Sequence, residues 1–154
     1  MWLRAALSRA QRAMDSRGMI EADAPLSLVL FSGTDDKLSA AAVLAVGAAA
    51  MGRPVNVFLQ YYAVDAFRAD RIRADHGVAL EATISQAKEI AAYPGQHWSE
   101  LLRQAKDLCD VKIHACALSM EMFHLEKTDL DPIVDDIEGV AAFMTDASGP
   151  ITFI

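Results

Sequence analysis

The chain has 154 residues, of which 53% are apolar and 23% are charged, a composition typical of one globular domain with a substantial core. Its formal net charge of −7 argues against a general nucleic-acid-binding protein. Two cysteines are too few for a disulfide framework and suit a reducing compartment, which indicates a cytoplasmic protein. Because no apolar run approaches the ~20 residues that span a bilayer, we expect no transmembrane helix.

The first 18 residues form a distinct segment with four arginines and one acid. Its apolar residues recur at helical spacing. They are Trp2, Leu3, Ala6, Ala10, Ala13 and Met14. We expect an amphipathic helix within an N-terminal extension over residues 1–24, ahead of a domain over residues 25–154. The helix packs on the domain or on a neighbouring subunit, contacts a membrane surface or a partner, or serves as a transit peptide, and we favour the first alternative.

The domain begins with a strand–helix–strand unit. Residues 26–31 are a nearly continuous apolar run, as in a strand that is buried on both faces of a parallel sheet. An alanine-rich segment over residues 35–51 predicts a helix with acids in its first turn, ended by Gly52 and Pro54. Residues 54–60 predict the second strand. Because such units are right-handed with parallel strands, we expect a sheet that is at least partly parallel.

The rest of the chain continues to alternate helices and strands. Residues 68–97 are the least informative, with a possible short strand near 78–80 and a helical stretch that ends near Tyr93. The elements expected next are a helix over 98–108 capped by Ser99, a strand over 111–115, a helix over 117–125, an acidic helical turn over 128–136, a helix over 139–147 and a strand over 151–154. This pattern predicts an α/β sandwich, with a mainly parallel sheet of about five strands and helices on both faces.

A cysteine, Cys116, follows directly after the strand predicted over residues 111–115. In α/β proteins, ligands and reactive groups collect at the carboxyl ends of strands. The N-terminus of the following helix would also favour a thiolate over a thiol. The simplest alternative is a small buried apolar residue, which is the usual fate of a free cysteine. We therefore take Cys116 as the candidate reactive residue, with Ser119 in the following helix as a candidate for lining the same site.

Distances along the chain limit which residues can assist Cys116. His114 precedes it by two, so both side chains leave the same strand face about 6.5 Å apart, and the imidazole either favours the thiolate or is a hydrogen-bonded core histidine. Cys109 would lie roughly 20 Å away along the strand, beyond the ~7 Å that a disulfide allows, so we expect a structural role. His124 would lie about 12 Å along the helix, too far for a direct base or a shared metal site.

Two further segments reach the same edge of the predicted sheet. The turn over residues 32–37, which contains Ser32 and Gly33, joins a strand to a helix. It lacks the glycine patterns of the P-loop and of the Rossmann dinucleotide site, so we expect a capped turn or a wall of the site rather than a nucleotide site. Tyr61 and Tyr62 follow the second strand and either line the site or pack in the core or in an interface.

Four segments together resemble the DsrE/DsrF/DsrH-like family of small sulfur-handling proteins. They are residues 28–37, residues 45–58, residues 111–120, and residues 138–141 with the final run 151–154. Each segment alone is a weak signal, but the alanine-rich helix that runs into Met51 and Gly52 is fairly specific in this combination. The resemblance implies a flavodoxin-like fold, homo-oligomers such as trimers or hexamers, and sulfur relay through a cysteine persulfide on the residue that is Cys116 here.

Three hypotheses of function follow. The first is a cytoplasmic sulfur carrier or sulfurtransferase that holds sulfane sulfur as a persulfide on Cys116 and passes it to a partner thiol, with no metal or other cofactor. Its expected partners are sulfur donor and acceptor proteins or small persulfides. The second is a non-catalytic oligomeric scaffold or regulator with the same fold. The third is a protein that binds a small ligand or a flavin at the same sheet edge.

Overall fold

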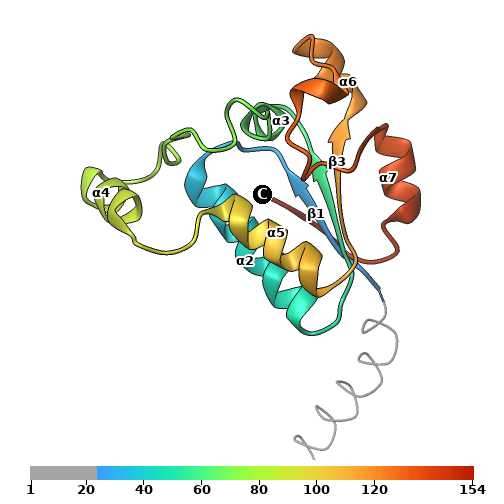
Figure 1. Cartoon of the computed structure of the whole chain (residues 1–154), viewed down its shortest axis with the longest axis horizontal. Coiled ribbons are helices and arrows are strands. Elements are labelled where there is room, and N and C mark those ends of the chain that lie inside the picture. Colours follow the sequence, from blue (N-terminus) through green and yellow to red (C-terminus); the bar gives the residue numbers. More distant parts are fainter. Residues whose placement is uncertain (1–23) are drawn as a thin grey trace, which may run out of the picture.

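Five parallel strands form the centre of the computed structural model, which describes residues 24–154 (Figure 1). The strands are β1 (Leu26–Leu30), β2 (Val55–Leu59), β3 (Val111–Cys116), β4 (Asp136–Glu138) and β5 (Ile151–Phe153). Their order in the sheet is β4-β3-β2-β1-β5, so the chain steps one way from β1 to β4 and then crosses back to β5. Both edge strands, β4 and β5, are only three residues long.

The crossover direction decides which helix covers which face, because parallel crossovers are right-handed. Helices α2 (Asp35–Ala50) and α5 (Trp98–Leu108) lie side by side on one face (Figure 1). Helix α7 (Val140–Asp146) connects β4 to β5 and packs on the opposite face, where its Phe143 joins Val29 and Phe58. Helices on both faces of a parallel sheet confirm the predicted three-layer, flavodoxin-like sandwich.

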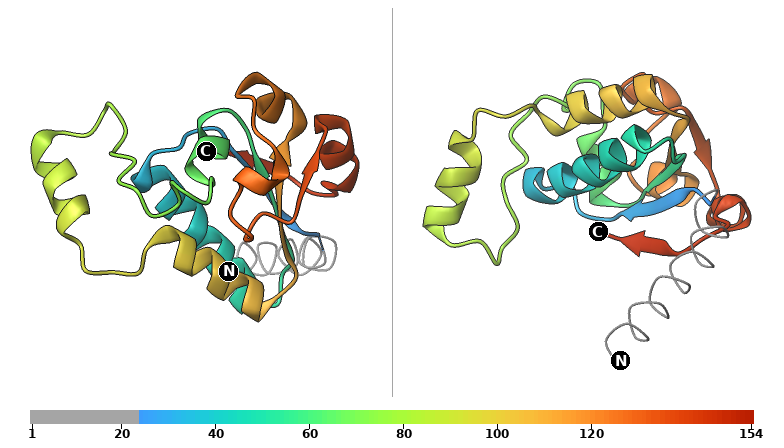
Figure 2. Two further views of the ribbon diagram at one scale, coloured as in Figure 1. Left: turned by 45° about the horizontal axis from the view of Figure 1, so that its top comes forward. Right: turned by 90° about the horizontal axis from the view of Figure 1, so that it is seen from below.

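Three further α-helices complete the fold. They are α3 (Tyr62–Ala66), α4 (Ile84–Ala92) and α6 (Ala117–Met122). Helix α4 buries none of its residues and stands apart from the sheet in every view (Figure 2). Thr83 caps it: its hydroxyl accepts from the Gln86 N–H while the Gln86 side chain accepts from the Thr83 N–H. Local capping therefore stabilises a helix that has little tertiary support.

Small side chains allow α2 to lie close to the sheet and to α5. Its buried positions are Leu38, Ala41, Ala42, Ala45, Ala48 and Ala49. The helix ends as predicted, because Gly52 has a φ of +74° and the N–H groups of Gly52 and Arg53 bond to the carbonyls of Ala49 and Ala48. A left-handed glycine directly after a helix satisfies its last carbonyls.

The structure corrects several details of the predicted elements. The cap of α5 is His97, whose Nδ1 accepts from the Ser99 N–H, and not Ser99. The acidic helix expected over 128–136 is wrong: η1, a short 3-10 turn (Lys127–Asp129), comes first and strand β4 begins at Asp136. The strand suggested near 78–80 is absent from the described residues, which have no regular structure there.

Two further expectations concern the ends of segments. Helix α6 stops at Met122, earlier than predicted, because His124 adopts a φ of +54° that a right-handed helix cannot include. The amphipathic helix expected over residues 1–18 lies outside the described residues, as does the rest of the 1–24 extension except Ala24. Across residues 24–154, no helix is both long enough and apolar enough to cross a bilayer.

Candidate functional site

The carboxyl ends of β1, β2 and β3 meet at one edge of the sheet, because the three strands are parallel and in register. Ser32 and Gly33 follow β1, Tyr61 and Tyr62 follow β2, and Cys116 ends β3. The predicted site residues therefore reach the same edge, but they divide between the two faces of the sheet and the turns above it.

Cys116 lies beneath α7. It is 4% exposed and belongs to a small apolar cluster with Val29, Phe58 and Phe143. The rings of Phe58 and Phe143 stack with centroids 4.7 Å apart, so α7 is held to the sheet directly over this region. Cys116 is also the N-cap of α6, but that helix has six residues rather than the expected nine and offers less stabilisation to a thiolate.

His114 and Glu138 lie on the same face of the sheet as Cys116. His114 precedes Cys116 by two residues of β3, and Glu138 is the register partner of Cys116 on β4. The Nδ1 atom of His114 is 3.8 Å from Oε2 of Glu138, and the two side chains are 19% and 16% exposed. Nδ1 is fully buried and has no hydrogen-bond partner among the described residues. The alternative that His114 is a hydrogen-bonded core histidine therefore does not agree with the structure, because its buried Nδ1 makes no hydrogen bond.

Glu138 occupies an environment that disfavours its charged form. Burial raises the pKa of Glu138 above its usual value. The neighbouring His114 opposes that shift, whereas the carboxylates of Asp146 and Asp136 add to it. A largely buried acid beside an unpartnered imidazole is a pairing that can exchange or share a proton.

Ser119 and Tyr61 link two of the segments at this edge. The backbone N–H of Tyr61 donates to Oγ of Ser119 at 2.9 Å, and Ser119 is buried. Tyr61 has a φ of +46°, an uncommon conformation for a residue with a side chain. The hydrogen bond holds the strained turn after β2 against α6, which gives Ser119 a structural contact.

The turn after β1 uses its acids to fix a loop. Oδ1 of Asp35 accepts from Trp98 Nε1 at 3.0 Å and Oδ2 accepts from the His76 N–H at 2.9 Å. Asp36 accepts from the Ala79 N–H at 3.2 Å. A Cβ added to Gly33 would lie 2.4 Å from the carbonyl oxygen of Tyr62, so only glycine fits there. These contacts give the turn a structural role, although Thr34, the N-cap residue of α2, makes no side-chain capping hydrogen bond.

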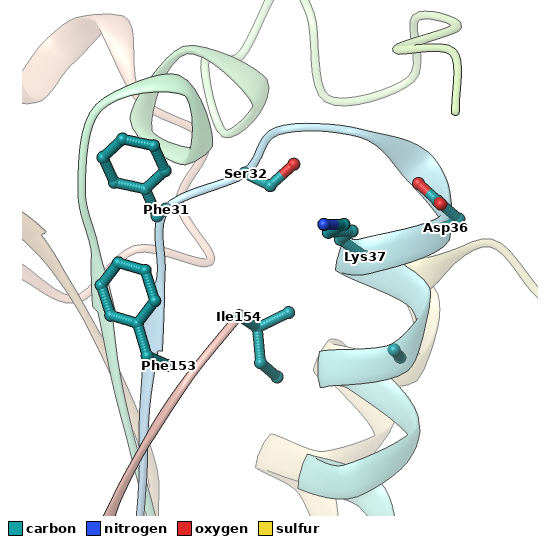
Figure 3. Close-up of a pocket in the computed structure, with 7 residues that line it drawn as sticks. Phe31, Ser32, Asp36, Lys37, Phe153 and Ile154 are labelled. Atoms are coloured by element: carbon teal, nitrogen blue, oxygen red, sulfur yellow. The ribbon is translucent and has the colours of Figure 1, made fainter. Parts of the chain in front are cut away.

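Two shallow hollows flank this turn. The first, of about 580 Å³, is lined by Phe31, Ser32, Asp36, Lys37, Ala40, Phe153 and Ile154 (Figure 3). In Figure 3, Ser32 and Lys37 point toward one another, and the rings of Phe31 and Phe153, 5.7 Å apart, lie one above the other. The second, of about 300 Å³, includes Ser32, Gly33 and Tyr62 in its lining. Cys116 lines neither, so Ser32, Gly33 and Tyr62 are not brought together with the cysteine in a common hollow.

Cys109 does not belong to the site around Cys116. Cys109 is half-buried, unbonded, and caps the C-terminal end of α5 at the amino end of β3. Among residues 24–154, no three His, Cys, Asp or Glu side chains gather in a way that could hold a metal ion.

Sequence reasoning missed Glu138 and Phe143 as parts of this site. Glu138 belongs to an acidic run that reads most simply as a solvated surface, and only the presence of β4 brings it beside Cys116. Phe143 had one available signal, because it is the only aromatic residue in the helix predicted over 139–147.

The family comparison agrees with the resemblance noted above. Residues 22–93 and 75–150 match the DsrE/DsrF/DrsH-like family. The chain is 28% identical over 154 aligned residues to the uncharacterized protein YrkE of Bacillus subtilis strain 168, covering 84% of this chain and 94% of that protein. It is also similar, with a TM-score of 0.43 and 16% identity, to the protein of unknown function MTH1491 from Methanobacterium thermoautotrophicum, over 84% of this chain and 97% of that one. The two family matches together span most of the sequence, and the chain belongs to the DsrE/DsrF/DrsH-like family.

Proposed function

We propose that the protein is a sulfur carrier that holds sulfane sulfur as a persulfide on Cys116 and relays it to a partner thiol. Membership of a family of sulfur-relay proteins supports the class of function. The observation that carries the residue assignment is the position of Cys116 at the carboxyl end of β3, with His114 and Glu138 on the same sheet face. Cys109, the only other cysteine in the sequence, lies at the opposite end of the strand.

The chemistry needs no oxidant or cofactor. The Cys116 thiolate attacks the terminal sulfur of a donor persulfide, the donor S–S bond breaks, and the donor thiolate leaves. An acceptor thiolate then attacks the outer sulfur of the Cys116 persulfide and regenerates the Cys116 thiolate. Each step is a thiol–disulfide type exchange in which one S–S bond forms as another breaks.

Burial of Cys116 sets a condition on this mechanism. A donor cannot reach a sulfur that lies under α7 with 4% exposure, so loading requires that α7 moves away from Phe58. Local opening of a seven-residue helix held by one buried aromatic residue is a low-energy event compared with global unfolding. We further propose that a donor or acceptor protein, or a second copy of the chain in a homo-oligomer, favours the open form, and that the protein acts in the reducing cytoplasm.

Mass spectrometry of the intact protein tests the proposal. The wild-type chain is incubated with glutathione persulfide, freed of the donor and weighed without reductant. We expect a gain of one sulfur atom that persists in Cys109→Ser and disappears in Cys116→Ser. A gain that instead follows Cys109, or no gain in any variant, rejects Cys116 as the carrier.

A second candidate function is a non-catalytic scaffold or regulator of the same fold, and the burial of Cys116 is the observation that favours it. The two functions differ in the reactivity of Cys116. In the Cys109→Ser variant, the Cys116 of a carrier reacts with iodoacetamide at neutral pH much faster than global unfolding allows, because local opening exposes it. The Cys116 of a scaffold reacts only as fast as the protein unfolds.

A further inference from the structure

The face of the sheet beneath α7 gathers three groups that can carry a proton: the thiol of Cys116, the imidazole of His114 and the carboxyl of Glu138. Cys116 and Glu138 are register partners on neighbouring strands, which lie about 4.8 Å apart in a sheet. Nδ1 of His114 is buried without a hydrogen bond and lies 3.8 Å from Glu138. A buried polar atom that lacks a partner costs about 1–3 kcal/mol, so its retention calls for an explanation.

We propose that His114 and Glu138 act as a proton-handling pair for Cys116, in which Glu138 orients the His114 ring and His114 accepts the thiol proton. This inference rests on the proposed function. Because Nδ1 is the ring nitrogen nearest the Glu138 carboxylate, the tautomer with hydrogen on Nδ1 leaves Nε2 as the base, the same division of roles as in other nucleophile–base–acid arrangements. His114 is then the catalytic base and Glu138 a positioning residue.

The spacing of the pair agrees with this role. A distance of 3.8 Å is longer than a hydrogen bond and shortens when the imidazole gains a positive charge beside a carboxylate. Contacts between catalytic groups are commonly loose before the substrate binds. Protonation of His114 at Nε2 would thus draw its Nδ1–H toward the Glu138 carboxylate and place a compensating positive charge beside it.

The proton balance of sulfur loading closes with these groups alone. The Cys116 proton moves to His114 as the thiolate attacks the outer sulfur of the donor persulfide. The donor S–S bond breaks, and the leaving donor thiolate takes the proton back from His114. The products are the Cys116 persulfide and the donor thiol, and His114 returns to its neutral form.

Other charges near the pair must be separated from its effect. Asp136 comes from β4, Asp146 from α7 and Lys112 from the same face of β3, whereas β2 contributes the uncharged Phe58 opposite His114. Asp136 provides a matched control, because it lies on the same strand as Glu138 and carries the same charge but is exposed.

The test follows the ultraviolet absorbance of the thiolate as a function of pH, in a Cys109→Ser background so that Cys116 alone reports. We expect His114→Gln to leave about tenfold less thiolate at neutral pH and Glu138→Gln about threefold less, because Glu138 acts through His114. Asp136→Asn should change little. His114→Asn serves as a second variant, and circular dichroism verifies the fold of each protein.

The proposal is overturned if both His114 variants titrate as the parent does, or if Asp136→Asn shifts the curve as much as Glu138→Gln. The absorbance needs no sulfur donor, so it separates the two proposals. A chain that titrates as expected but takes up no sulfur refutes the proposed function and leaves the pair in place. A chain that loads sulfur equally well without His114 refutes the pair and leaves the carrier.

Discussion

The two faces of the sheet bury different kinds of residue. The face beneath α2 and α5 carries a large core in which alternate residues of the strands, such as Leu28, Val57 and Ile113, are fully buried among apolar side chains. The face beneath α7 carries a small cluster around Phe143, with Cys116 in it and His114 beside it. Two buried side-chain polar atoms among the described residues have no hydrogen-bond partner, Ser27 Oγ and His114 Nδ1. Both belong to side chains on the sheet face beneath α7.

This difference separates stability from chemistry. Residues on the first face are closely packed, and none of their buried side-chain polar atoms lacks a hydrogen bond among the described residues, as expected of a structural core. The second face keeps an unpaired imidazole, a raised-pKa carboxyl and a thiol under one short helix, which a purely structural face would have replaced by apolar residues. The comparison predicts that substitutions on the two faces have different consequences.

The largest loss of stability is expected for Trp98→Ala on the first face. Trp98 is fully buried, its ring packs on Phe67 with centroids 4.9 Å apart, and its Nε1 donates to Asp35. We expect a loss of about 4–5 kcal/mol, from the lost packing and from the loss of one of the two hydrogen bonds that the Asp35 carboxylate accepts. Urea unfolding measures it, and a loss below ~1 kcal/mol would show that this face is not the main source of stability.

Phe143→Ala is expected to cost less and to change reactivity. Phe143 covers Cys116, but its removal leaves a site that opens to solvent rather than a sealed cavity, so we expect a loss of about 3 kcal/mol. Alkylation of Cys116 should accelerate by more than about tenfold, because local opening becomes easier. Met144→Ala on the same helix, where the side chain is 55% exposed, is the control and should alter neither quantity. Destabilisation without faster alkylation would mean that α7 does not limit access.

Asp135→Asn tests a carboxylate that links α5 to β3, because Asp135 accepts hydrogen bonds from Lys106 and from the Ile113 N–H. Burial alone would raise the pKa of Asp135, but hydrogen bonds from Lys106 and the Ile113 N–H, with the positive charge of Lys106, hold it below its usual value. The stability that this lowered pKa provides is present above the normal aspartate range and is lost as pH falls through the folded pKa. We expect a loss of about 1–2 kcal/mol at pH ~7 that begins to decline only below pH ~4, as the pH approaches the lowered folded pKa. Urea unfolding across this pH range measures it, with the exposed Asp110→Asn as control.

Glu138→Gln should show the smallest effect and the opposite sign. Because burial raises its pKa, ionised Glu138 disfavours the folded state, and that penalty appears as pH rises through the folded pKa. We expect the variant to be more stable than the parent at neutral pH by less than about 1 kcal/mol and equal to it below pH ~4. Loss of stability at neutral pH would mean that the His114 contact outweighs the cost of burying the charge.

Most of the fold could be predicted because its signals are local. Short runs rich in apolar and β-branched residues predicted β1, β2 and β3, with Pro25 and Gly33 on either side of β1 and Pro54 before β2. Gly52 and Pro54 ended α2 where expected. The segment over 128–136 failed because a three-residue edge strand is too short to show a period, and its acids resemble the first turn of a helix. Its pairing with β3 is a tertiary contact that no local pattern encodes.

The same limit applies to the candidate site. Cys116 and His114 could be proposed because they share one strand and a period of two places them on one face. Glu138 could not, since it reaches Cys116 only through the pairing of β4 with β3. The cover formed by Phe143 depends on the return of the chain across the sheet from β4 to β5, a feature of topology rather than of spacing.

The short strands at both edges of the sheet also bear on how copies of the protein can associate. An exposed edge recruits another strand by offering unpaired N–H and C=O groups, and longer edges recruit more strongly. With three residues each, β4 and β5 present few such groups. Extension of the sheet from one molecule to the next, the route to open-ended fibres, is therefore disfavoured. Assembly into closed oligomers would rely on side chains of the helices rather than on shared β-structure.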